Sequence, residues 1–381
     1  MLGHMEADRA RLIETEARIL DHEDQMACLA RSLFQLRAEK MATQGRLDAY
    51  KYPVLKLPNE IVSEIFVHFL PVYPRPPPLT GIRSPTWLTL ICRKWREIAL
   101  ATPALWRAIG LTGHIPYEQR DQISEIWIKR TGSGSLSIKI HNTHLSEMIP
   151  AVVAHRARWE HLHLRVCVSA LSKIMGPMPL LSHLHLKLEG VAEDNTFTLH
   201  EVPQLRTVAL DVCDFTGSVM TLPWGQLTSL RLDYLHPSDC VPILQQTTNL
   251  IHCGLHLRTH DSHVHSGPDM TLPFLESLTL TLSLSAPVPG FLHAFTAPAL
   301  RSLHTTELCL EPNPIATLTA FISKSGCRLH TLHIRESSGD KDSYIHAFSS
   351  IPDFSSSRSW PDISSDEEDE EDAEDDSTDS E

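Results

Sequence analysis

The chain has 381 residues and a formal net charge of -14. No apolar run is long enough to predict a membrane-spanning helix, and the polar N-terminus lacks the apolar core of a signal peptide. The acidity is concentrated in residues 366–381, which hold 12 acidic side chains and no basic one. Without them, 35 acidic residues face 33 basic ones. The strongly basic surface of a nucleic-acid-binding protein is therefore excluded.

The eight cysteines form no Cys-x-x-Cys pair and follow no zinc-finger spacing. Together with the missing signal peptide, this predicts reduced thiols in the cytoplasm, the nucleus or both. No nucleotide-binding or hydrolase motif occurs either. We expect no cofactor, no metal and no enzymatic activity.

Residues 1–50 are predicted to form a helix, because residues 6–47 contain no proline and many strong helix formers. Apolar side chains recur at one heptad position, although Lys40 interrupts the series: Leu12, Ile19, Met26, Leu33 and Leu47. A second seam with Leu29 and Leu36 is less regular. Two interpretations stay open, namely a coiled coil that binds a partner or a second copy, and a solvated helix with one apolar stripe.

Residues 51–109 are predicted to form three short helices. Pro58 stands where a first helical turn begins, and apolar residues follow at helical spacing up to Leu70. Residues 71–78 contain five prolines and cannot be helical. Ser84-Pro85 and Thr102-Pro103 are two further start signals, with serine or threonine as the N-cap and proline at the first helical position.

From residue 159 onward, the pattern apolar-x-x-apolar-x-apolar recurs eight times at intervals of about 22–29 residues, which is the spacing of leucine-rich repeats. The triplets begin at Trp159, Leu181, Leu205, Leu227, Leu250, Leu275, Leu300 and Leu329. Each predicts a short strand with alternate side chains in the core, and residues 238–246 and 314–324 are expected to return as helices. We assign the repeats to 159–345, an irregular cap with a strand pair at 126–140 to 110–158, and a disordered acidic tail to 355–381.

The helical segment resembles an F-box. The resemblance rests on the Leu57-Pro58-Asn59-Glu60 opening, the Cys92-Arg93-Lys94-Trp95 centre and the final Leu105-Trp106, which stand in the family's order. The whole layout resembles the F-box-like proteins of mushroom-forming fungi, in which a coiled-coil leader precedes the F-box and degenerate leucine-rich repeats follow it. It implies an α+β protein, with a small three-helix F-box followed by a leucine-rich-repeat-like solenoid.

The resemblance also implies a function. F-box proteins dock on the Skp-type adaptor of SCF cullin-RING ubiquitin ligases and present a protein substrate through a second domain. Residue by residue, the family's helical and adaptor-contacting positions correspond to Leu57, Pro58, Ile61, Ile65, Cys92 and Trp95. The alternative is a scaffold outside any ligase, which self-associates through its N-terminal helix and binds proteins through its repeats.

The outward residues of the predicted strands are candidates for substrate contact, since they can vary without disturbing the core. They are Arg165, Lys187, Asp211, Arg231, Asp233, His256, His333 and Arg335. Positive charge is expected at the two ends of this face and negative charge in its middle. Many outward positions are histidines, which indicates either a pH-sensitive or metal-binding face or plain polar filler. The loop 260–265, with three histidines, is the best local metal candidate.

Overall fold

A computed structural model describes residues 2–49, 53–111, 117–141, 150–167, 171–174, 176–189, 197–199, 201–212, 220–258, 269–282, 287–336 and 341–357. The chain divides into two compact units, residues 1–62 and 63–381. Within the described part of the chain, no helix is both long and apolar enough to cross a membrane.

The first unit is dominated by α1 (Leu2–Ala49), followed by η1 (Pro53–Lys56) and the first residues of α2 (Asn59–Phe69). The predicted N-terminal helix is confirmed. Its apolar heptad side chains are at least half exposed, from 50% at Leu33 to 69% at Met26. The stripe is therefore available to a partner, and whether it has one is untested.

The second unit begins with helices that start at the predicted positions. In α3 (Pro85–Ile91), the N-cap Ser84 accepts the Thr86 N–H at 3.2 Å, and Pro85 occupies the first turn. Phe66 of α2 packs edge-to-face on Trp95 of α4 (Arg93–Leu100), with ring centroids 5.0 Å apart. After η2 (Pro103–Leu105), the chain passes directly into a strand.

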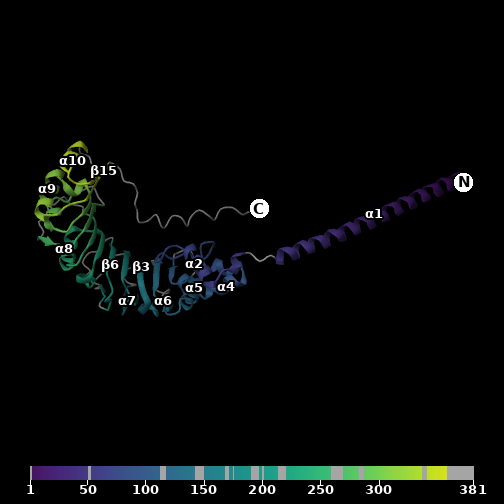
Figure 1. Cartoon of the computed structure of the whole chain (residues 1–381), viewed down its shortest axis with the longest axis horizontal. Coiled ribbons are helices and arrows are strands. Elements are labelled where there is room, and N and C mark those ends of the chain that lie inside the picture. The colour runs from purple at the N-terminus through teal and green to yellow at the C-terminus, as the bar shows by residue number, and fades with distance from the viewer. Residues whose placement is uncertain are drawn as a thin grey trace. The chain divides into compact units, whose positions relative to one another are not determined.

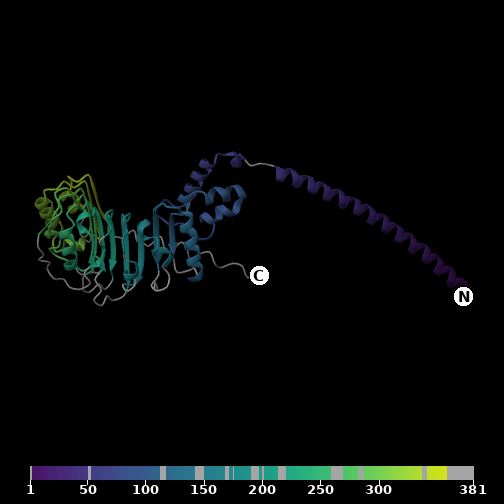
Figure 2. The same ribbon diagram turned by 90° about the horizontal axis from the view of Figure 1, so that it is seen from below.

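An eleven-stranded sheet forms the body of this unit, and every strand pair in it is parallel. In spatial order, the strands are β1 (Ala108–Leu111), β2 (Leu136–His141), β3 (Trp159–Cys167), β4 (His183–Glu189), β6 (Thr207–Val212), β8 (Ser229–Leu235), β9 (His252–Leu257), β11 (Ser277–Leu282), β13 (Ser302–Thr306), β14 (Thr331–Arg335) and β15 (Asp353–Ser357). They run side by side through the second unit (Figure 1, Figure 2).

Two described helices that connect strands lie on the same side of the sheet. Within the second unit the strands follow an arc, with α8 (Pro237–Gln246) and α9 (Pro314–Ser325) on its outer side (Figure 1). These two helices confirm the predicted return helices. Shorter connections include α6 (Pro150–Val153), α7 (Leu171–Ile174) and α10 (Lys341–Ala347). Two further parallel pairs, β5 (Phe197–Thr198) with β7 (Met220–Thr221) and β10 (Met270–Thr271) with β12 (Phe295–Thr296), also join successive connections.

The apolar triplets form the strands and pair in register, as predicted. Leu184 lies opposite Val208, which lies opposite Leu230, and the same column continues through Cys253, Leu278, Leu303 and Leu332. Each of these side chains is at most 3% exposed. Burying one large apolar side chain contributes about 1.5–3 kcal/mol, so the column is a main source of stability.

The expected fold class is wrong. The strands are not segregated from the helices as in an α+β protein; they form one large parallel sheet with helical crossovers, which is an α/β fold. A separate three-helix unit followed by a solenoid is not the organisation either. The boundary between the two compact units, at residues 62 and 63, falls inside α2. Helices α3 and α4 belong to the same unit as the sheet. Parallel strands need crossovers of a dozen or more residues, which is the physical reason for the repeat length.

Two local predictions also differ from the structure. The expected strand pair at 126–140 is half helix, because α5 (Tyr117–Arg130) buries Trp127 and Ile128, and only β2 is a strand. At the other end, residues 353–357 pair with β14, so the expected start of the tail at 355 falls inside β15. The expected boundary at 109 falls inside β1 in the same way.

Candidate protein-binding face of the parallel sheet

Alternate residues of the strands point away from the leucine columns, and we call the surface they form the open face. It has three columns, set by the parallel register. The first contains His161, His183, Thr207, Ser229, His252, Ser277, Ser302 and Thr331. The second contains Lys139, His163, His185, Ala209, Arg231, Gly254, Thr279, His304 and His333. The third contains His141, Arg165, Lys187, Asp211, Asp233, His256, Thr281, Thr306 and Arg335.

Charged side chains of the open face are linked by ion pairs, most of them around the third column. Arg165 Nε lies 2.6 Å from Glu189 Oε1, and Lys187 Nζ lies 2.9 Å from Asp211 Oδ2 on the next strand. Arg231 Nε contacts both carboxylate oxygens of Asp233, at 2.8 and 3.1 Å. Arg165 and Lys187, expected to form a positive end of this face, each have a carboxylate neighbour that offsets their charge.

Burial acts on these pairs. The side chain of Asp211 is only 9% exposed and that of Asp233 only 10%. Burial raises the pKa of Asp233, while the nearby Arg231 guanidinium opposes the rise. Removing the cation would leave a buried carboxylate charge without a partner, which is costly in free energy. The ion pairs of Asp211 and Asp233 therefore hold these side chains in place on the face.

Histidine rings meet across neighbouring strands in three groups, of which two contain stacked rings. His161 lies over His183 with ring centroids 4.3 Å apart, and His163 lies over His185 at 4.1 Å. His141 continues the second group at 5.1 Å from His163. The third group is His304 with His333, whose rings meet edge-on with centroids 4.5 Å apart.

Burial keeps five of these histidines neutral near pH 7, namely His161, His163, His183, His185 and His304. Burial, followed by the neighbouring His185 and His141, lowers the pKa of His163 to about 2. Burial also lowers the pKa values of His161, His183, His185, His256 and His304. Neutral rings accept hydrogen bonds, and His256 Nδ1 lies 2.7 Å from Thr281 Oγ1. His333 hydrogen-bonds Ser355.

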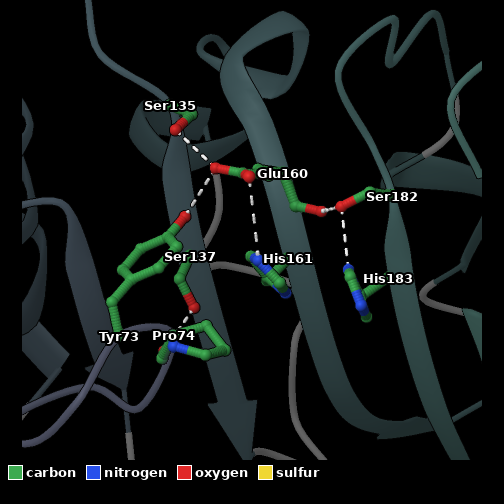
Figure 3. Close-up of polar contacts among 8 residues, drawn as sticks. All are labelled: Tyr73, Pro74, Ser135, Ser137, Glu160, His161, Ser182 and His183. Atoms are coloured by element: carbon green, nitrogen blue, oxygen red, sulfur yellow. Dashed lines mark hydrogen bonds and ion pairs between the residues drawn. The ribbon is translucent and has the colours of Figure 1, made fainter.

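The proline-rich segment covers one end of the open face. Tyr73 Oη donates to Glu160 Oε2 at 2.9 Å, and Ser135 Oγ donates to the same oxygen at 2.5 Å (Figure 3). Ser137 Oγ donates to the Pro74 carbonyl oxygen at 2.7 Å. The Tyr73 ring also meets His161 edge-on, with centroids 5.2 Å apart, and the Arg107 guanidinium lies 3.6 Å from its centre.

The pKa shifts in this network favour a charged Glu160 and a protonated Tyr73. The hydrogen bond from Ser135 lowers the pKa of Glu160, so the carboxylate stays charged, and burial together with Glu160 raises the pKa of Tyr73, which stays a donor. A Cβ on Gly110 would come within 3.1 Å of Pro76, so glycine permits this close approach. The segment is thus packed on β1, β2 and β3 at this end of the sheet.

The residues expected to bind an adaptor fall in both units. In the first, Leu57 is half-buried, Pro58 is exposed, and Ile61 is 49% exposed. In the second, Ile65 is 48% exposed, whereas Cys92 and Trp95 support the helices. The Cys92 Sγ accepts the Trp95 N–H at 3.4 Å, and Trp95 packs on Phe66. The exposed members are the ones able to meet a partner.

Sequence reasoning missed the partners of these side chains. Glu189, Thr281 and Tyr73 gave no signal of their own, since each acts across a neighbouring strand or loop; repeat register was the one clue that could have paired Lys187 with Asp211. Among the described residues, no group of three or more His, Cys, Asp or Glu is placed to hold a metal ion. The histidine loop 260–265 lies outside the described residues.

In comparisons with known proteins, no family model matches this chain and no curated protein matches it either. The resemblance to F-box proteins therefore rests on the motif residues alone.

Proposed function

We propose that this chain is a substrate-recognition subunit of an SCF-type cullin-RING ubiquitin ligase. In this proposal, the F-box-like segment docks on the Skp-type adaptor, and the open face of the sheet binds a protein substrate. The observation that carries it is the exposure of the motif residues Pro58, Ile61 and Ile65. Apolar side chains left half exposed at the positions where the resemblance expects contact are suited to an interface.

The open face suits the second role. Its side chains stand on strands whose other side is tightly packed, so a partner meets groups that are already ordered. Three ion pairs and the stacked histidines fix their directions. Such a surface recognises a protein by matching charges and hydrogen-bonding groups, which gives specificity more than affinity.

The chemistry of ubiquitin transfer would lie in the partner proteins. This chain would raise the local concentration of the substrate near the ligase, and it needs no catalytic residue or cofactor of its own. Its place of action would be the cytoplasm, the nucleus or both. No role at a membrane or on nucleic acid is part of the proposal.

The test is binding to the purified adaptor. The full chain is mixed with a Skp-type adaptor from a fungal SCF ligase and analysed by size-exclusion chromatography and calorimetry, with cullin added in a second step. A stoichiometric complex that recruits cullin is the expected result. Absence of binding by a folded wild-type chain would overturn the ligase proposal.

The alternative is a scaffold outside any ligase, and one observation favours it. The apolar heptad stripe of α1 is exposed along its whole length. A scaffold predicts self-association that is lost in the variant Ile19→Lys/Met26→Lys, with no dependence on the adaptor. Light scattering of the full chain and of this variant distinguishes the two functions.

A further inference from the structure

A pair of grooves lies at the amino-terminal edge of the sheet, away from the open face. The first has a volume of about 570 Å³ and is lined by Arg206, Gln226, Thr228, Asn249, Ile251, Phe274, Glu276 and Ala299. The second, of about 400 Å³, shares Glu276 and Ala299 with the first and extends to Arg301, Arg328 and His330. The backbone beneath the grooves is regular, because residues just before one strand hydrogen-bond to residues just before the next. For example, the Glu276 N–H donates to the Ile251 carbonyl oxygen at 2.9 Å.

The rim of these grooves is basic. Arg206, Arg301 and Arg328 are exposed, and Glu276 is the one carboxylate among the residues that line the two grooves. Within the described part of the chain, the guanidinium groups of Arg301 and Arg328 make no hydrogen bond and no ion pair. On the open face, by contrast, Arg165, Lys187 and Arg231 each face a carboxylate. The edge therefore offers cations that are ready to pair with an anion.

The chain itself supplies an anion of matching kind. Residues 366–381 hold 12 acidic side chains and no basic one. The nine residues from Ser357, where β15 ends, to Asp366 span up to about 30 Å when extended. Returning along β15 to the groove edge takes about 16 Å, and crossing two strands takes about 10 Å more. The acidic run can reach the second groove, whereas Trp360, only three residues past the strand, cannot.

We propose that the acidic run 366–381 of this chain binds along the basic grooves at the amino-terminal edge of the sheet. Its carboxylates pair with Arg301 and Arg328 first, and with Arg206 in the adjoining groove. The contact is electrostatic, since the run has no large apolar side chain to bury, so it is weak and sensitive to salt. It is independent of the open face and of adaptor docking.

The experiment uses the full chain in two forms. One is wild type, and the other has the 12 acidic residues of the run replaced by Asn and Gln, so that the grooves are vacated. A fluorescein-labelled peptide with the sequence of residues 366–381 is titrated into each at low salt. We expect the neutral-tail chain to bind it at least about tenfold more tightly than wild type, in which the tethered run competes at high effective concentration.

The groove is then tested by substitution in the neutral-tail background. Arg301→Gln/Arg328→Gln should weaken peptide binding by about tenfold or more, whereas Arg83→Gln, at an exposed arginine outside the grooves, should not. Unchanged thermal melting verifies that each variant is folded. Equal binding to wild type and the neutral-tail chain would mean that the run does not occupy the grooves. Binding that survives loss of both arginines, or no binding to the neutral-tail chain, would also overturn the proposal.

Discussion

The two faces of the sheet are built from the same strands and obey opposite rules. On the covered face, side chains such as Leu184, Leu210 and Leu278 are at most 2% exposed and pack against one another in columns. On the open face, one residue away along each strand, most side chains are polar, and charged ones such as Arg165 and Lys187 pair with carboxylates. Shape and volume govern the first face, while charge and protonation govern the second.

If the open face binds a substrate as proposed, this difference separates stability from recognition. A change on the covered face leaves a cavity that the packed neighbours cannot fill. A change on the open face disturbs an ion pair or a ring stack, and the strand below it stays paired. Both effects recur along the sheet, because neighbouring parallel strands place equivalent residues side by side.

The largest expected effect is on the covered face. Leu210→Ala should lower the free energy of unfolding by about 2–5 kcal/mol, through lost burial and the cavity left behind. Thr279→Ala, on the open face of β11, should change it by about 0.5 kcal/mol or less. Urea titrations followed by circular dichroism measure both. Similar losses from the two substitutions would remove the distinction between the faces.

A similar contrast is expected in the F-box-like segment, where the residues that precede α2 should govern binding rather than stability. Leu57→Ala/Pro58→Ala should weaken adaptor binding by about 30-fold or more, as expected for interface anchors worth about 2 kcal/mol. Calorimetry with the purified adaptor measures this, with the melting temperature as the control. A variant that binds normally would place the docking contact elsewhere.

Acid should destabilise the open face through its histidines. His163 has a pKa of about 2 in the folded chain and 6.5 as its ordinary value, so the unfolded chain takes up the proton first as the pH falls. The stabilising effect of the neutral ring is complete above pH 6.5 and is lost progressively below it. Between pH 7 and pH 5, the loss from one such group is about 1–2 kcal/mol.

Replacing that ring by an apolar one isolates the effect. The stability of His163→Phe should fall less between pH 7 and pH 5 than that of wild type, whereas His293→Phe, at an exposed position, should follow wild type. Denaturant unfolding at the two pH values is the measurement. Identical pH dependence in wild type and His163→Phe would contradict the assignment.

The smallest effect concerns the tail. Deleting residues 358–381 should change the melting temperature by no more than a few degrees, because a salt-sensitive contact with no apolar burial contributes little. Deleting from residue 355 also removes the end of β15 and its pairing with β14, so it should cost more. Equal melting temperatures for the two truncations would show that the end of β15 adds nothing to the sheet.

Part of this architecture was predictable from sequence and part was not. The triplets predicted strands and inward leucines, because two-residue alternation and a fixed repeat length are local signals. The fold class was missed because the repeats were expected to follow a separate helical unit, whereas β1 and β2 extend the same sheet toward it. The end of helix α5 was expected to be a strand, since Ile126, Trp127 and Ile128 are β-branched or aromatic residues that are common in strands.

The site was predictable only in outline. The outward positions of Lys187 and Asp211 followed from the pattern, but their pairing depends on which strands are neighbours. The Ser-rich residues of β15 resembled a tail because small polar side chains carry little strand signal. The Tyr73 contact with Glu160 joins residues 87 positions apart and has no local signature.

The most direct test of the account compares the open face with the outer helices by inverting charges without breaking pairs. Lys187→Asp/Asp211→Lys keeps the ion pair and reverses its direction, and Gln245→Glu/Gln246→Glu alters exposed side chains of α8. Proteins bound to each variant and to wild type are compared by quantitative pull-down, after folding has been verified. For proteins that bind wild type specifically, we expect the amount bound to the swapped-pair variant to fall at least about tenfold. The α8 variant should bind them in wild-type amounts. Equal loss from both, or loss from the α8 variant alone, would contradict recognition by the open face.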